Sequence, residues 1–294
     1  MSSQPLTQSL LGESTCWNPL TGRWRSQFRS DRLYSEINFV LSRFCQPFYD
    51  LFAHVDKLIS TPQGQPLPPN ASIQLLAQAL LLLTELYHDL NSQDLPPFFE
   101  EHLDDFMGNE AAGKEGWLRK YLSWEHPELK GDVSIARVNR TDMQDDDDAP
   151  GPLEKIRASI CEIAELYALK YSEDFKQLGS FVNGVWTMLT TAGPSAKEDL
   201  ASPPIEPEVE HRLTFQLVSR ALKFLSVIVK MGSHRDMFAA QDTLKAFCEK
   251  IILPNMGMRE SDEELFEDDP IEYIRRDLEP STGEFIPSGQ LWSI

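Results

Sequence analysis

Residues 33–59 read LYSEINFVLSRFCQPFYDLFAHVDKLI and give the strongest indication of the fold class. Apolar side chains recur along this stretch at spacings of three and four, the periodicity of an α-helix with one buried face. Pro47 lies within it and should kink or divide the helix, because proline lacks an amide hydrogen and clashes with the preceding turn. The stripe consists of Leu33, Ile37, Val40, Leu41, Phe44, Phe48, Leu51, Phe52, Val55, Leu58 and Ile59.

The same helical periodicity continues along the chain, between loops rich in proline. A loop at 61–70 holds four prolines and a glycine, and Ser72 after it can cap a helix over 73–90. No stretch alternates apolar and polar residues as a half-buried strand would. Further apolar stripes of helical spacing lie at 153–167, 175–189, 217–228 and 244–251.

Helices of this length in antiparallel pairs predict an all-α fold. Stacked pairs with a period on the order of 40–47 residues are typical of a solenoid of HEAT repeats. The pattern alone leaves a helix bundle as an alternative.

The charge of the chain is strongly acidic, with 46 acidic against 27 basic residues and a formal net charge of −19. Such a field repels nucleic-acid phosphates and anionic membrane surfaces, and it attracts basic proteins. The four cysteines form no C-x-x-C pair, which argues against a zinc or redox motif. Cys45, Cys161 and Cys248 lie in apolar helical patterns, where a free cysteine behaves as a small hydrophobe.

No catalytic motif is recognisable, so we expect neither an enzyme nor a cofactor. The chain lacks a G-x-S-x-G turn, a phosphate-binding glycine loop and an H-E-x-x-H helix, and its six histidines are scattered. The acidic run Asp145–Asp148 lacks the spaced ligands and the glycine of a calcium loop. We therefore expect no metal site.

The exceptional stretch is 260–279, which holds ten carboxylates and two arginines. The charge is interleaved with the apolar residues Leu265, Phe266, Ile271, Tyr273 and Ile274. The segment could therefore bind a basic protein surface, with these anchors supplying affinity and the acids steering encounter. Because Pro254 follows an apolar helical stripe, we expect the segment to project from a buried helix. The alternative is a solvated loop whose apolar residues hold it to its own helices.

Several long motifs resemble one protein family specifically. The runs CEKIILPNM (248–256), DEELFED (262–268) and EYIRRDLE (272–279) closely resemble CAS-type exportins, receptors of the importin-beta superfamily that re-export importin-alpha. The same resemblance recurs upstream, in RWR (23–25), FRSD (28–31), QDLPPFFEE (93–101), ELYALKY (165–171) and VSRALKFL (218–225). It covers roughly residues 23–281, which would be about the fourth to the eighth repeat of such a receptor.

The resemblance implies a nuclear transport receptor that shuttles between nucleus and cytoplasm and binds Ran-GTP and importin-alpha, with nuclear pore proteins as further partners. It also implies that the acidic insertion faces Ran or cargo. The residues carried over for that site are Asp262, Glu263, Glu264, Phe266, Glu267, Asp268, Asp269, Tyr273, Arg275, Arg276 and Asp277. The alternatives are a helical-repeat scaffold that does not depend on Ran, and a truncated product without function.

Four stretches have no counterpart in the family pattern: 1–22, about 133–144, about 201–216 and 283–294. We expect all four to be poorly packed, the first as a disordered N-terminus. Two alternatives would explain these stretches: translated introns, or insertions specific to one lineage.

Overall fold

The structure is a computed structural model that describes residues 30–61, 67–68, 71–129, 151–173, 175, 178–191, 215–231, 238–249 and 266–278. Within these ranges every regular element is a helix, and the only β-type pairing is an isolated bridge between Asn109 and Lys114. The chain divides into two compact units, Met1–Gly184 and Val185–Ile294. Each unit is described by itself.

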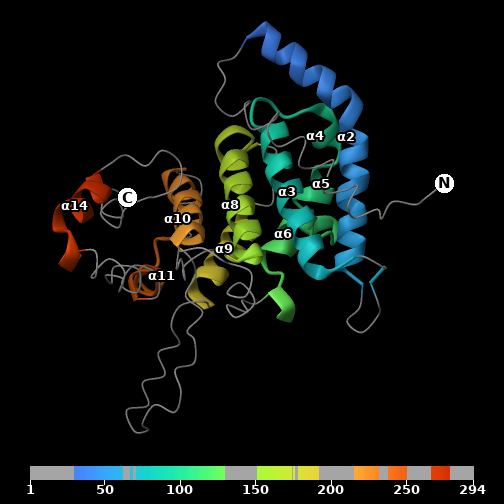
Figure 1. Cartoon of the computed structure of the whole chain (residues 1–294). Coiled ribbons are helices and arrows are strands. Elements are labelled where there is room, and N and C mark those ends of the chain that lie inside the picture. The colour runs from blue at the N-terminus through green and yellow to red at the C-terminus, as the bar shows by residue number, and fades with distance from the viewer. Residues whose placement is uncertain are drawn as a thin grey trace. The chain divides into compact units, whose positions relative to one another are not determined.

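The first long helix, α2 (Asp31–Ile59), contains the predicted stripe. Ser30 caps it, with its side-chain oxygen accepting a hydrogen bond from the Leu33 amide at 3.2 Å. Pro47 does not divide the helix, which corrects that alternative; Figure 1 shows instead that α2 bends along its length, as an interior proline would cause. The buried residues are Leu33, Ile37, Val40, Cys45, Phe48, Phe52 and Val55.

Helices α3 (Ile73–Asn91) and α8 (Pro152–Lys170) lie side by side (Figure 1). The predicted cap of α3 is confirmed, since the Ser72 side chain accepts from the Leu75 amide at 3.2 Å. The C-terminal ends of the two helices meet, because the Tyr171 hydroxyl donates to the Asn91 carbonyl at 2.6 Å and Lys170 donates to the Ser92 carbonyl. The two helices therefore run parallel, as equivalent helices of successive repeats do.

Five short helices follow α3 within residues 92–129: α4 (Pro97–Glu101), α5 (Leu103–Phe106), η2 (Glu110–Ala112), α6 (Trp117–Leu122) and η3 (Pro127–Leu129). Their aromatic side chains join those of α2 and α3 in one core. Phe106 stacks on Tyr87 with ring centroids 4.3 Å apart, and Trp117 stacks on Phe52 at 4.9 Å. Aromatic rings bury large apolar areas, so this cluster fixes the short helices against α2.

One half-buried carboxylate, Asp105, anchors the glycine-rich turn between α5 and α6. It accepts hydrogen bonds from the Tyr49 hydroxyl at 2.9 Å, from His102 Nδ1 at 3.1 Å and from Lys114. Burial alone would raise the pKa of Asp105, but these hydrogen bonds outweigh it and hold the pKa below its ordinary value. Conversely, burial and the hydrogen bond to Asp105 raise the pKa of Tyr49 to about 12.

The second unit contains α10 (Phe215–Lys230), α11 (Gln241–Phe247) and α14 (Pro270–Leu278), and α9 (Leu178–Thr191) crosses the boundary between the units. The predicted apolar face of α10 is confirmed as buried. In contrast, α11 buries none of its residues, and Leu244 is 53% exposed. The expectation of a buried helix before Pro254 is therefore wrong for its described part, 241–249.

The three cysteines that lie in apolar helical patterns differ in their burial. Cys45 and Cys161 are buried, and burial raises the pKa of both thiols, to about 11 and about 12. Cys248 is exposed, because the helical turns around it pack no core.

Most of the stretches without a family counterpart lie outside the described residues, namely 1–22, 133–144, 201–214 and 283–294, and so does Asp145–Asp148. Phe215 and Gln216 are the exception, since they form the first two positions of α10.

Candidate protein-binding segment

The described part of the acidic segment is a short helical turn, 266–268, followed by α14. The start of α14 is set locally. The side chain of Asp269 accepts a hydrogen bond from the Ile271 amide at 3.2 Å, and its backbone carbonyl accepts from the Tyr273 amide at 3.1 Å. Pro270 occupies the first helical position, where no amide donor is needed. An acidic cap and a proline thus begin the helix.

The apolar side chains of this segment face solvent. Ile271 is 70% exposed and Ile274 is 51% exposed, and residues three apart lie on the same side of a helix. Phe266, 45% exposed, meets the ring of Tyr273 edge-on with centroids 5.5 Å apart. The ring contact ties the turn at 266–268 to α14, so that aromatic and aliphatic groups belong to one short structured element.

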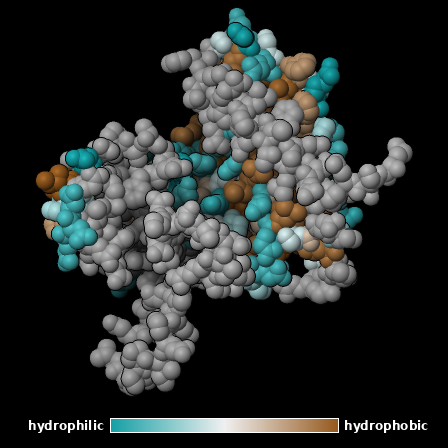
Figure 2. Space-filling model, in the orientation of Figure 1, coloured by the Kyte–Doolittle hydropathy of each residue, from teal (hydrophilic) through white to brown (hydrophobic). Residues whose placement is uncertain are grey.

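Acidic side chains lie directly beside these apolar groups. Glu267, Asp268 and Asp269 are all exposed, and Arg275 is an exposed cation on α14. Figure 2 shows hydrophobic and hydrophilic surface next to each other on this helix. Exposed apolar groups bordered by carboxylates suit contact with a partner that carries apolar groups among basic ones.

The structure describes six of the predicted site residues with their side chains: Phe266, Glu267, Asp268, Asp269, Tyr273 and Arg275. It brings Phe266 and Tyr273 together. Arg276 and Asp277 belong to α14, but their side chains lie outside the described part, as do Asp262, Glu263 and Glu264 entirely. Ile271 and Ile274 are among the apolar side chains that the sequence indicated as anchors, although they were not among the residues carried over from the family. The structure shows both exposed.

Among the described residues, no group of three His, Cys, Asp or Glu side chains comes together in a way that could hold a metal ion. No helix in this part of the chain is long and apolar enough to cross a membrane.

Known proteins match the chain over nearly its whole length. The importin-alpha re-exporter of Schizosaccharomyces pombe is 40% identical over 263 residues, which are 89% of this chain and 23% of that protein. Human exportin-2 is 36% identical over 260 residues, 88% of this chain and 23% of that protein. The importin alpha re-exporter of Saccharomyces cerevisiae is 35% identical over 271 residues, 92% of this chain and 24% of that protein.

A solved structure agrees with these relatives. The structure titled "The exportin Cse1 in its cargo-free, cytoplasmic state" matches with a TM-score of 0.70 and 33% identity, covering 96% of this chain and 26% of that one. This match confirms the predicted fold class, an all-α solenoid of HEAT repeats. The chain spans about a quarter of the length of the relatives it matches.

The family model described as Cse1 matches residues 20–284. Since this range is most of the chain, and since the relatives are 35–40% identical across it, the chain belongs to the Cse1 family.

Proposed function

We propose that this chain is part of a nuclear export receptor that carries importin-alpha from the nucleus to the cytoplasm together with Ran-GTP. The observation that carries the proposal is the match over 88–92% of the chain to proteins named importin-alpha re-exporter and exportin-2. Because the chain spans only about a quarter of those proteins, we propose this role for a longer receptor of which the chain forms one part.

Within this chain, the segment 260–279 is the part that we propose faces Ran or importin-alpha. Its support is the combination of exposed carboxylates at 267–269 with the exposed side chains of Phe266, Ile271 and Ile274. Carboxylates accelerate encounter with a basic partner over a range of about 8 Å at physiological salt. Apolar side chains that become buried on contact then slow dissociation.

The proposed mechanism is thermodynamic linkage. Ran-GTP and importin-alpha each favour the same arrangement of repeats in the complete receptor, so that each raises the other's affinity. Ran hydrolyses its own bound GTP, and both Ran and importin-alpha then dissociate from the receptor. The catalytic step therefore belongs to Ran and not to this chain. The receptor shuttles between nucleus and cytoplasm and contacts nuclear pore proteins during passage.

A pull-down with immobilised chain tests the proposal. We expect more Ran to be retained in its GTP form than in its GDP form, and importin-alpha to increase that retention. Equal retention of the two nucleotide forms would instead favour a helical-repeat scaffold that does not depend on Ran. Complete absence of retention for a folded chain would show that this part of the receptor does not bind Ran by itself.

Charge-reversal variants locate the binding segment. Glu267→Lys, Asp268→Lys and Asp269→Lys together should abolish the preference for Ran-GTP. The matched control reverses three exposed acids in the first unit, Glu100, Glu101 and Glu110, and changes the net charge equally. If the control variant loses binding to the same degree, the effect belongs to the overall charge and the segment has no special part in it.

A further inference from the structure

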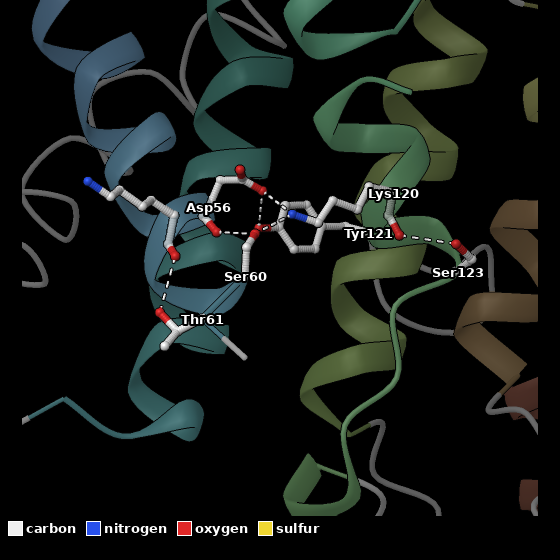
Figure 3. Close-up of polar contacts among 7 residues, drawn as sticks. Asp56, Ser60, Thr61, Lys120, Tyr121 and Ser123 are labelled. Carbon is white, nitrogen blue, oxygen red and sulfur yellow. Dashed lines mark hydrogen bonds and ion pairs between the residues drawn. The ribbon is translucent and has the colours of Figure 1, made fainter. Parts of the chain in front are cut away.

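Lys120 of α6 connects this helix to the last turn of α2. Its ammonium donates hydrogen bonds to Asp56 Oδ1 at 2.6 Å and to Ser60 Oγ at 2.6 Å, and it lies over the ring of Tyr121 at 5.2 Å from the centroid. Figure 3 shows the side chains of Asp56, Ser60, Lys120 and Tyr121 converging at this point. We name the contact of Lys120 with Asp56 and Ser60 the α2–α6 latch.

The two bonds of the latch depend on the positive charge of Lys120, whereas two other contacts of α6 with α2 do not. Trp117 stacks on Phe52, and the buried Tyr121 hydroxyl donates to Asp56 Oδ1 at 2.7 Å; neither contact needs a charge on Lys120. Among the residues that the structure describes, the latch alone joins α6 to Ser60, whose amide and hydroxyl both donate to the Asp56 carbonyl at the end of α2. Loss of the Lys120 charge would therefore release Ser60 from α6, while the Tyr121 bond still holds Asp56 and α6 stays packed.

The Lys120 side chain is also reachable from solvent, being 31% exposed. Ion pairs this open to water are weak, so the latch opens often on the timescale of chemical modification. While it is closed, the nitrogen donates its hydrogens to Asp56 and Ser60 and cannot present a lone pair to an electrophile. An acyl group on the nitrogen would remove the charge and two of the three ammonium hydrogens, leaving one donor where the closed latch uses two.

We propose that Lys120 is an acetylation site that acts as a switch on the junction between α2 and α6. The ammonium loses a proton to solvent, and the amine nitrogen attacks the carbonyl carbon of a thioester acetyl donor. The amide C–N bond forms as the C–S bond breaks, and the departing thiolate is protonated to the thiol. The resulting acetyl-lysine is neutral and keeps a single N–H, so it forms no ion pair with Asp56 and cannot donate to Asp56 and Ser60 together, and modification opens the latch. The switch is independent of the partners proposed above.

The first test measures acetylation of the unaltered chain with the N-hydroxysuccinimide ester of acetate, followed by mass spectrometry. Lys57, an exposed lysine at the end of α2, is the internal standard. We expect Lys120 to react about fivefold more slowly than Lys57, because the latch must open first. Asp56→Asn should remove most of this difference and leave the rate at Lys57 unchanged. Equal rates at the two lysines in the unaltered chain would overturn the proposal.

The second test measures hydrogen exchange in Lys120→Gln, which resembles acetyl-lysine, beside Lys120→Arg, which keeps the charge, and Lys57→Gln as a matched neutralisation. We expect the amides of Ser60 and Thr61 to exchange about fivefold faster in Lys120→Gln only, with protection of the interior of α2 unchanged. The proposal is wrong if Lys120→Gln and Lys120→Arg exchange alike at these amides. It is equally wrong if Lys120→Gln exposes the whole of α2, since the latch would then support the fold and could not act as a switch.

Discussion

The hydroxyl oxygens of Tyr87 and Tyr167 lie 2.7 Å apart between α3 and α8, and neither side chain reaches solvent. Both residues end the same tripeptide, Glu-Leu-Tyr, at 85–87 and 165–167. Because the two helices run parallel, the repeated tripeptide places like residues opposite each other. The pair therefore links successive repeats through a buried hydrogen bond between equivalent positions.

Replacing both members of this pair should cost less stability than the sum of the two single replacements. Tyr87→Phe or Tyr167→Phe leaves a buried hydroxyl with one partner fewer, at a cost of about 1–3 kcal/mol. The double variant removes both hydroxyls and should lose less stability than the sum of the two single changes. Urea unfolding of the four proteins measures this coupling free energy. Additive losses would mean that the two hydroxyls do not depend on each other.

High pH should destabilise the first unit through its tyrosines. Burial and the hydrogen bond to Asp105 raise the pKa of Tyr49 to about 12, and burial also raises the pKa of Tyr87 and Tyr121. The unfolded chain ionises near the ordinary value of about 10 while the folded chain keeps its protons. The stabilisation is therefore complete below pH 10 and is lost as pH rises toward 12.

Unfolding by urea at several values between pH 9 and pH 12 measures this loss. Tyr49→Phe should start from a lower stability at pH 9, because it lacks the bond to Asp105, but it should decline less steeply above pH 10. An identical slope in the variant would show that Tyr49 does not contribute to the alkaline loss.

Two glycines of α9 should respond differently to alanine. A Cβ at Gly184 would lie 2.8 Å from Leu122 Cδ2 and 3.2 Å from Arg119 Cζ, whereas a Cβ at Gly179 would meet nothing within 4 Å. Alanine favours the helix by up to about 1 kcal/mol over glycine. Gly179→Ala should therefore stabilise the chain, and Gly184→Ala should destabilise it by about 1–2 kcal/mol through overpacking.

Thermal unfolding of the two glycine variants provides the comparison. Leu122→Ala should reduce the penalty of Gly184→Ala in the double variant, because it removes the atom that the new Cβ approaches. A stabilising effect of Gly184→Ala equal to that of Gly179→Ala would contradict the close approach of α6 and α9.

The exposed isoleucines of α14 should matter for binding and little for stability. Ile271→Ser with Ile274→Ser removes apolar surface that faces solvent, so the free energy of unfolding should change by less than about 0.5 kcal/mol. Affinity for Ran-GTP should fall about tenfold or more if these side chains become buried in the complex. Titration calorimetry measures the affinity, and Val229→Ser, which changes an exposed apolar residue of α10, is the control. Unchanged affinity would limit the contact to the acidic side chains.

Much of the helical architecture could be predicted because its signals are local. The spacing of apolar residues and the caps Ser30 and Ser72 depend on neighbours within four positions, and α2, α3 and α8 form where these signals lie. The effect of Pro47 was only partly predictable, since neighbouring packing keeps α2 continuous. The acidic segment could be recognised from residue order. The exposure of Ile271 and Ile274 could not be predicted in the same way, because two apolar residues at helical spacing occur on buried and on exposed helix faces alike.

Residue order alone was enough to establish the helical class, the family and the acidic character of this chain, because periodicity, motif and charge are properties of short stretches. The three-dimensional arrangement was needed for the contacts between distant residues. Asp56 meets Lys120 across 64 positions, and Tyr87 meets Tyr167 across 80. The exposure of Cys248 also required the three-dimensional arrangement, because the burial of a side chain depends on which other segments pack against its helix. Such pairings follow from the stacking of repeats, whose register no single helix specifies.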